Sequence, residues 1–159
     1  MSPPRPDTID VQFTVEDGVN AEWDEERVGA LVRAIVSREL SSGQYVVALH
    51  FVGDESIRQL NAAHRGQDIH TDVLSFPLQA GDDFVLPPAE PTNLGDVVVS
   101  YPRARKQAEE FGHSTDREVA YLVAHGVLHV LGYDHEVDAD RTRMRQREEE
   151  ALRPLGFIR

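Results

Sequence analysis

The chain has 159 residues, which fits one domain, and its apolar fraction of 40% is sufficient for a hydrophobic core. It contains no cysteine, which excludes disulfides, thiolate metal ligands and cysteine nucleophiles, so a metal site must use His, Asp or Glu. The net charge of −12 argues against general nucleic-acid binding, because phosphate affinity depends on clustered cations, so any such contact requires a local basic surface.

The N-terminal segment predicts a strand followed by a helix. Residues 1–7 are rich in proline, and we expect them to be frayed. Over 9–15 apolar and polar residues alternate, which is typical of a half-buried strand. Asp24 is a candidate N-cap, and apolar residues then recur at helical spacing as far as about Leu40.

The next segments predict a second strand, a short helix and a third strand. The run YVVALHFV at 45–52 is almost wholly apolar and indicates a strand in the middle of a sheet. Residues 54–63 have the pattern of a helix with Asp54 as its N-cap. A polar loop then leads into a short apolar strand at 72–76.

A long loop separates the third strand from the fourth. Residues 77–93 contain four prolines and several acids, which indicates an exposed connection. An apolar strand over 94–100 follows. Ser100 is positioned to cap a helix over 101–111.

Two further helices complete the chain. Thr115 and Glu118 form a capping-box pattern that opens a strongly apolar helix, which ends before Gly132. The last helix, over 138–152, has a thin apolar stripe and is expected on the surface. This order of elements predicts a single α+β or mixed α/β domain over 1–159, with a mixed sheet of about four strands and four to five helices.

Three of the seven histidines, His125, His129 and His135, lie within one run of eleven residues. The first two are four residues apart on a predicted helix, so both can reach one ion at the usual zinc–nitrogen distance of about 2.0–2.1 Å. Gly132 allows a sharp turn that can return His135 as a third ligand. Three protein ligands leave a fourth position open, which is the catalytic arrangement of zinc, and one ion per chain is predicted.

The spacing is similar to the zinc helix of metzincin peptidases, with one departure. Gly126 stands where those enzymes have the glutamate that acts as general base. One interpretation is that the missing side chain leaves room near the metal for substrate or backbone. A zinc peptidase therefore remains an alternative function, although the chain lacks the general base of those enzymes at this position.

Three blocks of sequence resemble the YbeY family of bacterial rRNA-maturation endoribonucleases. They are HGVLHVLGYDH at 125–135, LNAAHRGQDIHTDVLSFP at 60–77 and LGDVVVS at 94–100. The departures, His64 and His70, lie outside the histidine motif. The resemblance covers roughly residues 45–135 and implies a zincin-like histidine helix within the α+β domain.

The same resemblance implies an activity, a metal and partners. The activity is single-strand-specific cleavage in 16S rRNA 3′-end maturation, ribosome assembly and quality control, with Zn²⁺ on His125, His129 and His135. Arg65 matches a family arginine associated with function in the cleft. The implied partners are the small ribosomal subunit with its rRNA, one small-subunit protein and the GTPase Era.

Two arginine-rich segments are considered as RNA contacts beside Arg65. Arg103, Arg105 and Lys106 form a basic group in the helix before the histidine helix, and we predict an RNA track there. Four arginines at 141, 143, 145 and 147 alternate on the last helix, point to several faces and are interpreted as mainly solvated.

The sequence leaves alternatives for the chemical step and for the role of the metal. The attacking group is either a hydroxide on the zinc or the 2′-hydroxyl of RNA, and His113 and Asp134 are candidates for proton transfer. A non-catalytic assembly factor with a structural metal is a further alternative. No signal peptide and no apolar run long enough for a membrane span is visible, so a cytoplasmic protein without a membrane partner is expected.

Overall fold

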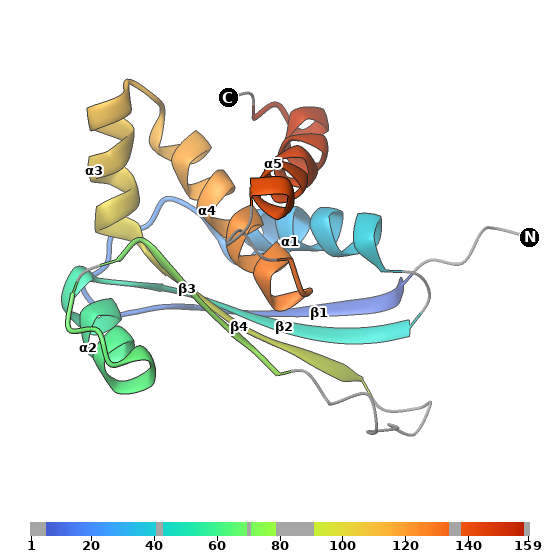
Figure 1. Cartoon of the computed structure of the whole chain (residues 1–159), viewed down its shortest axis with the longest axis horizontal. Coiled ribbons are helices and arrows are strands. Elements are labelled where there is room, and N and C mark those ends of the chain that lie inside the picture. Colours follow the sequence, from blue (N-terminus) through green and yellow to red (C-terminus); the bar gives the residue numbers. More distant parts are fainter. Residues whose placement is uncertain (1–5, 41–42, 70, 79–90, 134–137, 158–159) are drawn as a thin grey trace, which may run out of the picture.

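One twisted sheet carries helices on both of its faces (Figure 1). The computed structural model describes residues 6–40, 43–69, 71–78, 91–133 and 138–157. Within these ranges α1, α3, α4 and α5 cover one face, and α2 lies against the other face near one end of the sheet (Figure 1). The arrangement confirms the predicted α+β fold.

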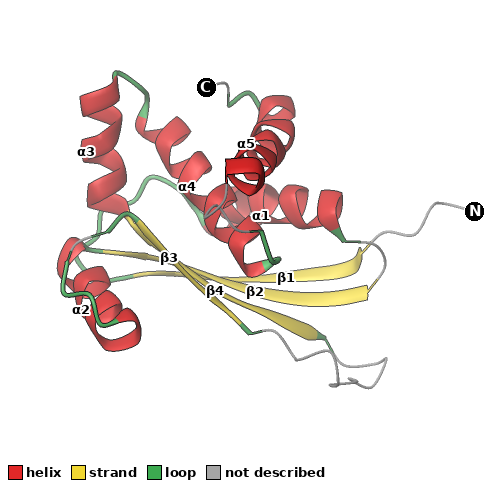
Figure 2. Ribbon diagram, viewed as in Figure 1, coloured by secondary structure: helices red, strands yellow, loops and turns green. Residues whose placement is uncertain are grey.

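The sheet has four strands in the order β1-β2-β4-β3 (Figure 2). Their bounds are Pro6–Val15 for β1, Gly43–Val52 for β2, Val73–Pro77 for β3 and Thr92–Ser100 for β4. The first three strands in this order are parallel to one another, and β3 pairs antiparallel with β4 at the edge. The predicted mixed sheet of about four strands is therefore confirmed.

Several boundaries differ from those expected, and the beginnings of β1 and β4 differ in the segments predicted to be frayed or a loop. β1 already begins at Pro6, within the segment 1–7 expected to be frayed, because Pro6 pairs with Gly43 of β2 before a shift of register at Thr8. β4 begins at Thr92, which pairs with Tyr45. Most of the loop predicted over 77–93 lies outside the described residues.

The five helices agree closely with the predicted segments. Their bounds are Glu25–Glu39 for α1, Asp54–Arg65 for α2, Tyr101–Phe111 for α3, Thr115–Val130 for α4 and Asp138–Leu152 for α5. Asp24 and Ser100 act as the predicted N-caps, because their side chains accept hydrogen bonds from the backbone N–H groups of Arg27 and Arg103.

Two predicted caps are wrong by one residue. The N-cap of α2 is Gly53, because the Asp54 carboxylate instead accepts a hydrogen bond from Ser100 Oγ at 2.7 Å. The N-cap of α4 is Ser114, whose Oγ accepts from Arg117 N at 3.1 Å, so Thr115 is the first helical residue.

The helix α4 occupies the centre of the helical layer. It contacts β3 and β4 on one side and α1, α3 and α5 on its others. The thin apolar stripe of α5 is buried against this centre, with Met144 1% and Leu152 0% exposed. The helix expected on the surface therefore contributes to the core, although most of its residues are exposed.

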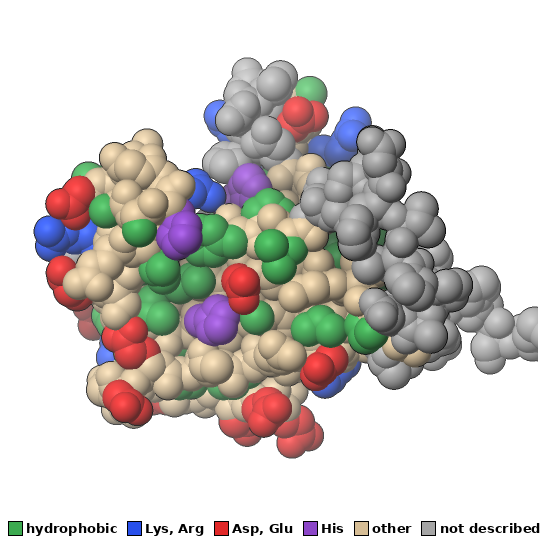
Figure 3. Space-filling model, turned by 90° about the horizontal axis from the view of Figure 1, so that it is seen from below, with side chains coloured by type: hydrophobic (Ala, Val, Ile, Leu, Met, Phe, Trp, Pro, Cys, Tyr) green, Lys and Arg blue, Asp and Glu red, His purple; other side chains and the backbone are tan. Residues whose placement is uncertain are grey.

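The opposite face of the sheet is only partly covered. Viewed from below, hydrophobic side chains surround histidine and acidic side chains on this face (Figure 3). His50 lies here, between Thr14 Oγ1 at 2.6 Å and Asp96 Oδ1 at 3.2 Å. In the described part of the chain, no helix combines the length and apolar character needed to span a membrane.

Candidate metal centre

The helix α4 brings His125 and His129 side by side. Their ring centroids are 5.0 Å apart and the rings are nearly perpendicular, at 73°. Two imidazoles that bind one tetrahedral ion through nitrogens at about 2.0–2.1 Å place their centroids about 5 Å apart. The pair therefore fits a shared divalent ion, and nitrogen ligands of this kind suit zinc and several other transition metals.

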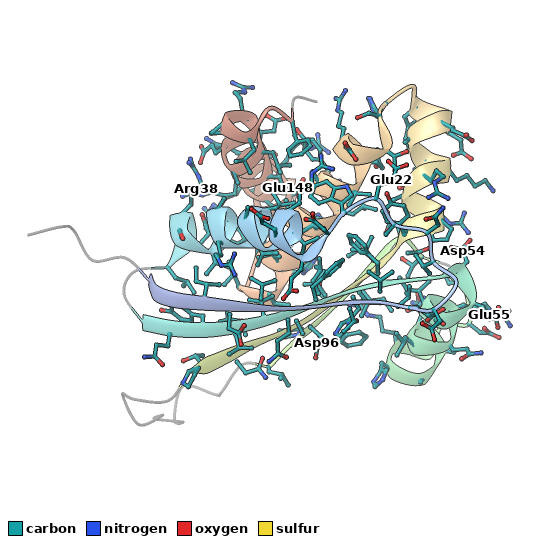
Figure 4. The ribbon with its side chains drawn as sticks, turned by 180° about the vertical axis from the view of Figure 1, so that it is seen from behind. Glu22, Arg38, Asp54, Glu55, Asp96 and Glu148 are labelled. Carbon is teal, nitrogen blue, oxygen red and sulfur yellow. The ribbon has the colours of Figure 1, made fainter. Side chains whose placement is uncertain are left out.

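A carboxylate that the sequence did not identify holds the first histidine. Glu148 of α5 places Oε2 at 2.9 Å from His125 Nδ1, and its side chain is only 8% exposed. This bond orients the ring and leaves Nε2 for a metal, which is the usual arrangement of a carboxylate behind a metal-binding histidine. Figure 4 shows Glu148 inside the helical layer, whereas Asp96 lies on the other side of the sheet.

Gly126 has a packing role beside the histidines. A Cβ at this position would lie 2.4 Å from Val97 Cγ1 and 3.3 Å from Ser75 Oγ, so a side chain would collide with the sheet. Ser75 Oγ also donates a hydrogen bond to the Gly126 carbonyl oxygen at 3.0 Å. The glycine lets α4 approach β3 and β4 closely, which explains its presence without the empty space for substrate considered above.

The turn after α4 directs the chain toward the third predicted ligand. Gly132 has φ of 107°, a conformation that favours glycine. Tyr133 donates its hydroxyl to Glu39 Oε1 of α1, which connects the end of this turn to α1. Burial raises the pKa of Tyr133 above its usual value, and the hydrogen bond to Glu39 adds to the shift. His135 itself lies outside the described residues.

Arg65, at the end of α2, lies next to the strand that packs on the histidine helix. Its Nη2 donates to the Ser75 carbonyl oxygen at 3.4 Å, and Ser75 in turn bonds to Gly126. Arg65 is exposed, so its guanidinium remains accessible to a ligand. One residue of β3 thus connects the arginine to the segment between His125 and His129.

The predicted cationic group of α3 makes contacts within the protein. Arg103 Nη2 lies 3.6 Å from Asp54 Oδ2, and Arg105 donates to the Asn20 carbonyl oxygen at 2.8 Å. Lys106 is exposed. The two arginines connect α3 to neighbouring segments, and a contact of all three residues with RNA stays a prediction.

The other described histidines are not brought to this site. His50 bonds on the far face of the sheet, and the His64 ring contacts Phe76 at 5.1 Å. His113 follows α3 and lies near the Phe111 ring at 6.4 Å. The other candidate for proton transfer, Asp134, lies outside the described residues. The histidine at position 70 also lies outside them.

The chain is similar to known proteins over most of its length. The family model described as "Endoribonuclease YbeY" matches residues 12–156. The Endoribonuclease YbeY of Desulforamulus reducens is 50% identical over 139 residues, covering 85% of this chain and 91% of the relative. That of Roseiflexus sp. is 45% identical over 155 residues, covering 96% and 95%.

A solved structure has a similar fold. The solution structure of TM1509 from Thermotoga maritima matches with a TM-score of 0.59 at 26% identity, covering 91% of each chain. The family match spans both described histidines, the arginine at the end of α2 and the glutamate of α5. The match of the family model over most of the chain and the identity with these relatives show that the chain belongs to the YbeY family of endoribonucleases.

Proposed function

We propose that this chain is a metal-dependent endoribonuclease whose metal is held by His125, His129 and His135. The observation that carries the proposal is the 5.0 Å separation of the first two rings, with Glu148 bonded behind one of them. The family gives the activity, since its members are named endoribonucleases. Zn²⁺ is the proposed ion, because imidazole nitrogens are common zinc ligands and the family resemblance implies zinc.

The residues around the proposed ion have different roles. When bound, the ion supplies Lewis-acid polarisation of a phosphoryl oxygen and lowers the pKa of a coordinated water. Glu148 keeps the His125 ring oriented, and Gly126 fixes the distance of α4 from the sheet. Arg65 can hold a phosphate oxygen with its planar guanidinium and stabilise charge that develops there.

The proposed substrate is the precursor of 16S rRNA at its 3′ end, in keeping with the resemblance noted above. The small ribosomal subunit, one of its proteins and the GTPase Era are the proposed partners, and the cytoplasm is the proposed compartment. Because the chain carries a net charge of −12, binding of RNA requires a local cationic surface.

The proposal is tested with zinc-loaded protein on a labelled single-stranded RNA and on casein. We expect RNA cleavage by the wild type, and loss of cleavage and of stoichiometric zinc in His129→Ala. His50→Ala is the matched control, since His50 lies on the opposite face of the sheet. Cleavage of casein alone would support a peptidase, and intact RNA with bound zinc would support a non-catalytic assembly factor.

A further inference from the structure

A cavity of about 420 Å³ opens beside His125, between α3, α4, α5 and the beginning of β3. Its floor is the face of α4 that carries Glu118, Leu122 and His125. His129 is the next residue on this face, because residues three and four apart are neighbours on a helix. The volume lies within the range of about 300–1,000 Å³ that is typical of ligand pockets. The cavity is therefore large enough for a ligand group that continues from the metal centre.

One wall of the cavity is cationic. Arg141 and Arg145 of α5 both line it, and their spacing of four residues places them on one face of the helix. Within the described chain, Arg145 makes no hydrogen bond or ion pair with another residue. The cavity is also lined by the carboxylates of Asp72, Glu118 and Glu148, so its positive charge is confined to these two guanidinium groups, which can hold an anionic ligand.

The alternating arginines of α5 are divided between two cavities. Arg143 and Arg147 line a separate cavity beside Gly132 and Tyr133. Arg147 also pairs with Glu150 at 3.4 Å. The four arginines, all interpreted above as mainly solvated, thus belong to two faces, and only Arg141 and Arg145 share a cavity with His125.

The opposite wall offers an aromatic ring and polar groups. Phe111, at the end of α3, is 62% exposed, which leaves its ring available for stacking. Gln107 Nε2 lies 3.4 Å from Asp72 Oδ2, so an amide and a carboxylate lie close together on the same wall. Proteins that bind single-stranded RNA combine aromatic stacking, Arg contacts to phosphate and polar groups that meet base edges.

We propose that this cavity is a nucleotide subsite for a single RNA strand, one nucleotide away from the scissile phosphate. The inference rests on the endoribonuclease function proposed above. The base stacks on Phe111 and its edge meets Gln107 and Asp72, while Arg141 and Arg145 hold the flanking phosphate. Selection for single strands follows, because a base in a duplex is stacked and paired and cannot enter the cavity.

The test compares two charge-matched double variants of the zinc-loaded protein. Arg141→Gln/Arg145→Gln removes the cationic wall. Arg143→Gln/Arg38→Gln is the control, because Arg143 lines the other cavity and Arg38 lies at the end of α1 away from α3 (Figure 4). Binding is measured by fluorescence anisotropy with a 2′-O-methyl oligonucleotide over a range of salt, and kcat and KM are measured with the unmodified RNA. Thermal melts check that each variant is folded.

We expect the cavity variant to bind roughly tenfold more weakly, with a salt slope reduced by about 1.4, because two phosphate contacts on a single strand are lost. Its KM should rise while kcat changes little. Phe111→Leu should weaken binding at least about fivefold and leave the salt slope unchanged, because it removes stacking and no charge.

The outcomes separate this inference from the proposed function. If the wild type cleaves RNA but the cavity variant binds and cleaves like the control, the subsite is refuted and the endoribonuclease function stands. If the wild type neither binds nor cleaves RNA, the proposed function fails and the subsite fails with it.

Discussion

The bond between Glu148 and His125 gives the sharpest prediction of metal affinity. The 2.9 Å contact joins a carboxylate that is 8% exposed to the nitrogen opposite the one assigned to the metal. Removing a carboxylate in this position typically lowers metal affinity by about 10–100-fold, or about 1.4–2.8 kcal/mol. Glu148→Gln keeps an acceptor for Nδ1, so its zinc affinity should be about tenfold lower than that of the wild type. Glu148→Ala removes both the acceptor and the charge, so its zinc affinity should be about 100-fold lower.

The assay is competition for zinc against a chromophoric chelator. Glu149→Gln is the matched control, since it changes charge equally at the next residue of α5. Melting of each metal-free variant checks that the protein is folded before zinc is added. Equal zinc affinities for Glu148→Ala, Glu148→Gln and Glu149→Gln would refute the reasoning. The Glu148 carboxylate would then not strengthen the binding of zinc by His125.

Three further changes test other parts of the account. Gly126→Ala should lower the free energy of unfolding by about 1–3 kcal/mol in denaturant titration, since its Cβ would lie 2.4 Å from Val97 Cγ1, and Val97→Ala should recover part of the loss. A more stable Gly126→Ala protein would contradict the packing role. Arg65→Gln should reduce kcat by about 100-fold with zinc affinity unchanged, measured on labelled RNA, and unchanged kcat would exclude Arg65 from the chemistry. Tyr133→Phe should cost about 1–3 kcal/mol of unfolding free energy, because Glu39 loses its hydroxyl donor, and an equal melt for both proteins would show that the contact is not needed.

Local patterns in the sequence predicted local structure well. The positions of His125 and His129 follow from helical spacing alone, and their rings are adjacent as that spacing requires. The caps at Asp24 and Ser100 depend on a polar residue just before a helix, which is also a local signal. Asp54 was misassigned because its carboxylate bonds to Ser100, forty-six residues away in sequence.

Contacts between distant elements could not be predicted in the same way. Glu148 is one of three consecutive glutamates on α5, and only the packing of α5 on α4 selects it as the partner of His125. The role of Gly126 depends on Val97 across the helix–sheet interface. The division of the α5 arginines likewise required the structure, because helical alternation shows that they face different ways but not which cavity each lines.

The central claim is that one divalent ion is shared by His125, His129 and His135, and an anomalous-scattering map at the zinc edge tests it most directly. Crystals of protein purified without chelator should show one peak, about 2.0–2.1 Å from a ring nitrogen of each histidine and with His125 bound through Nε2. A map with no peak at this site, or with a peak held by other side chains, would contradict the account.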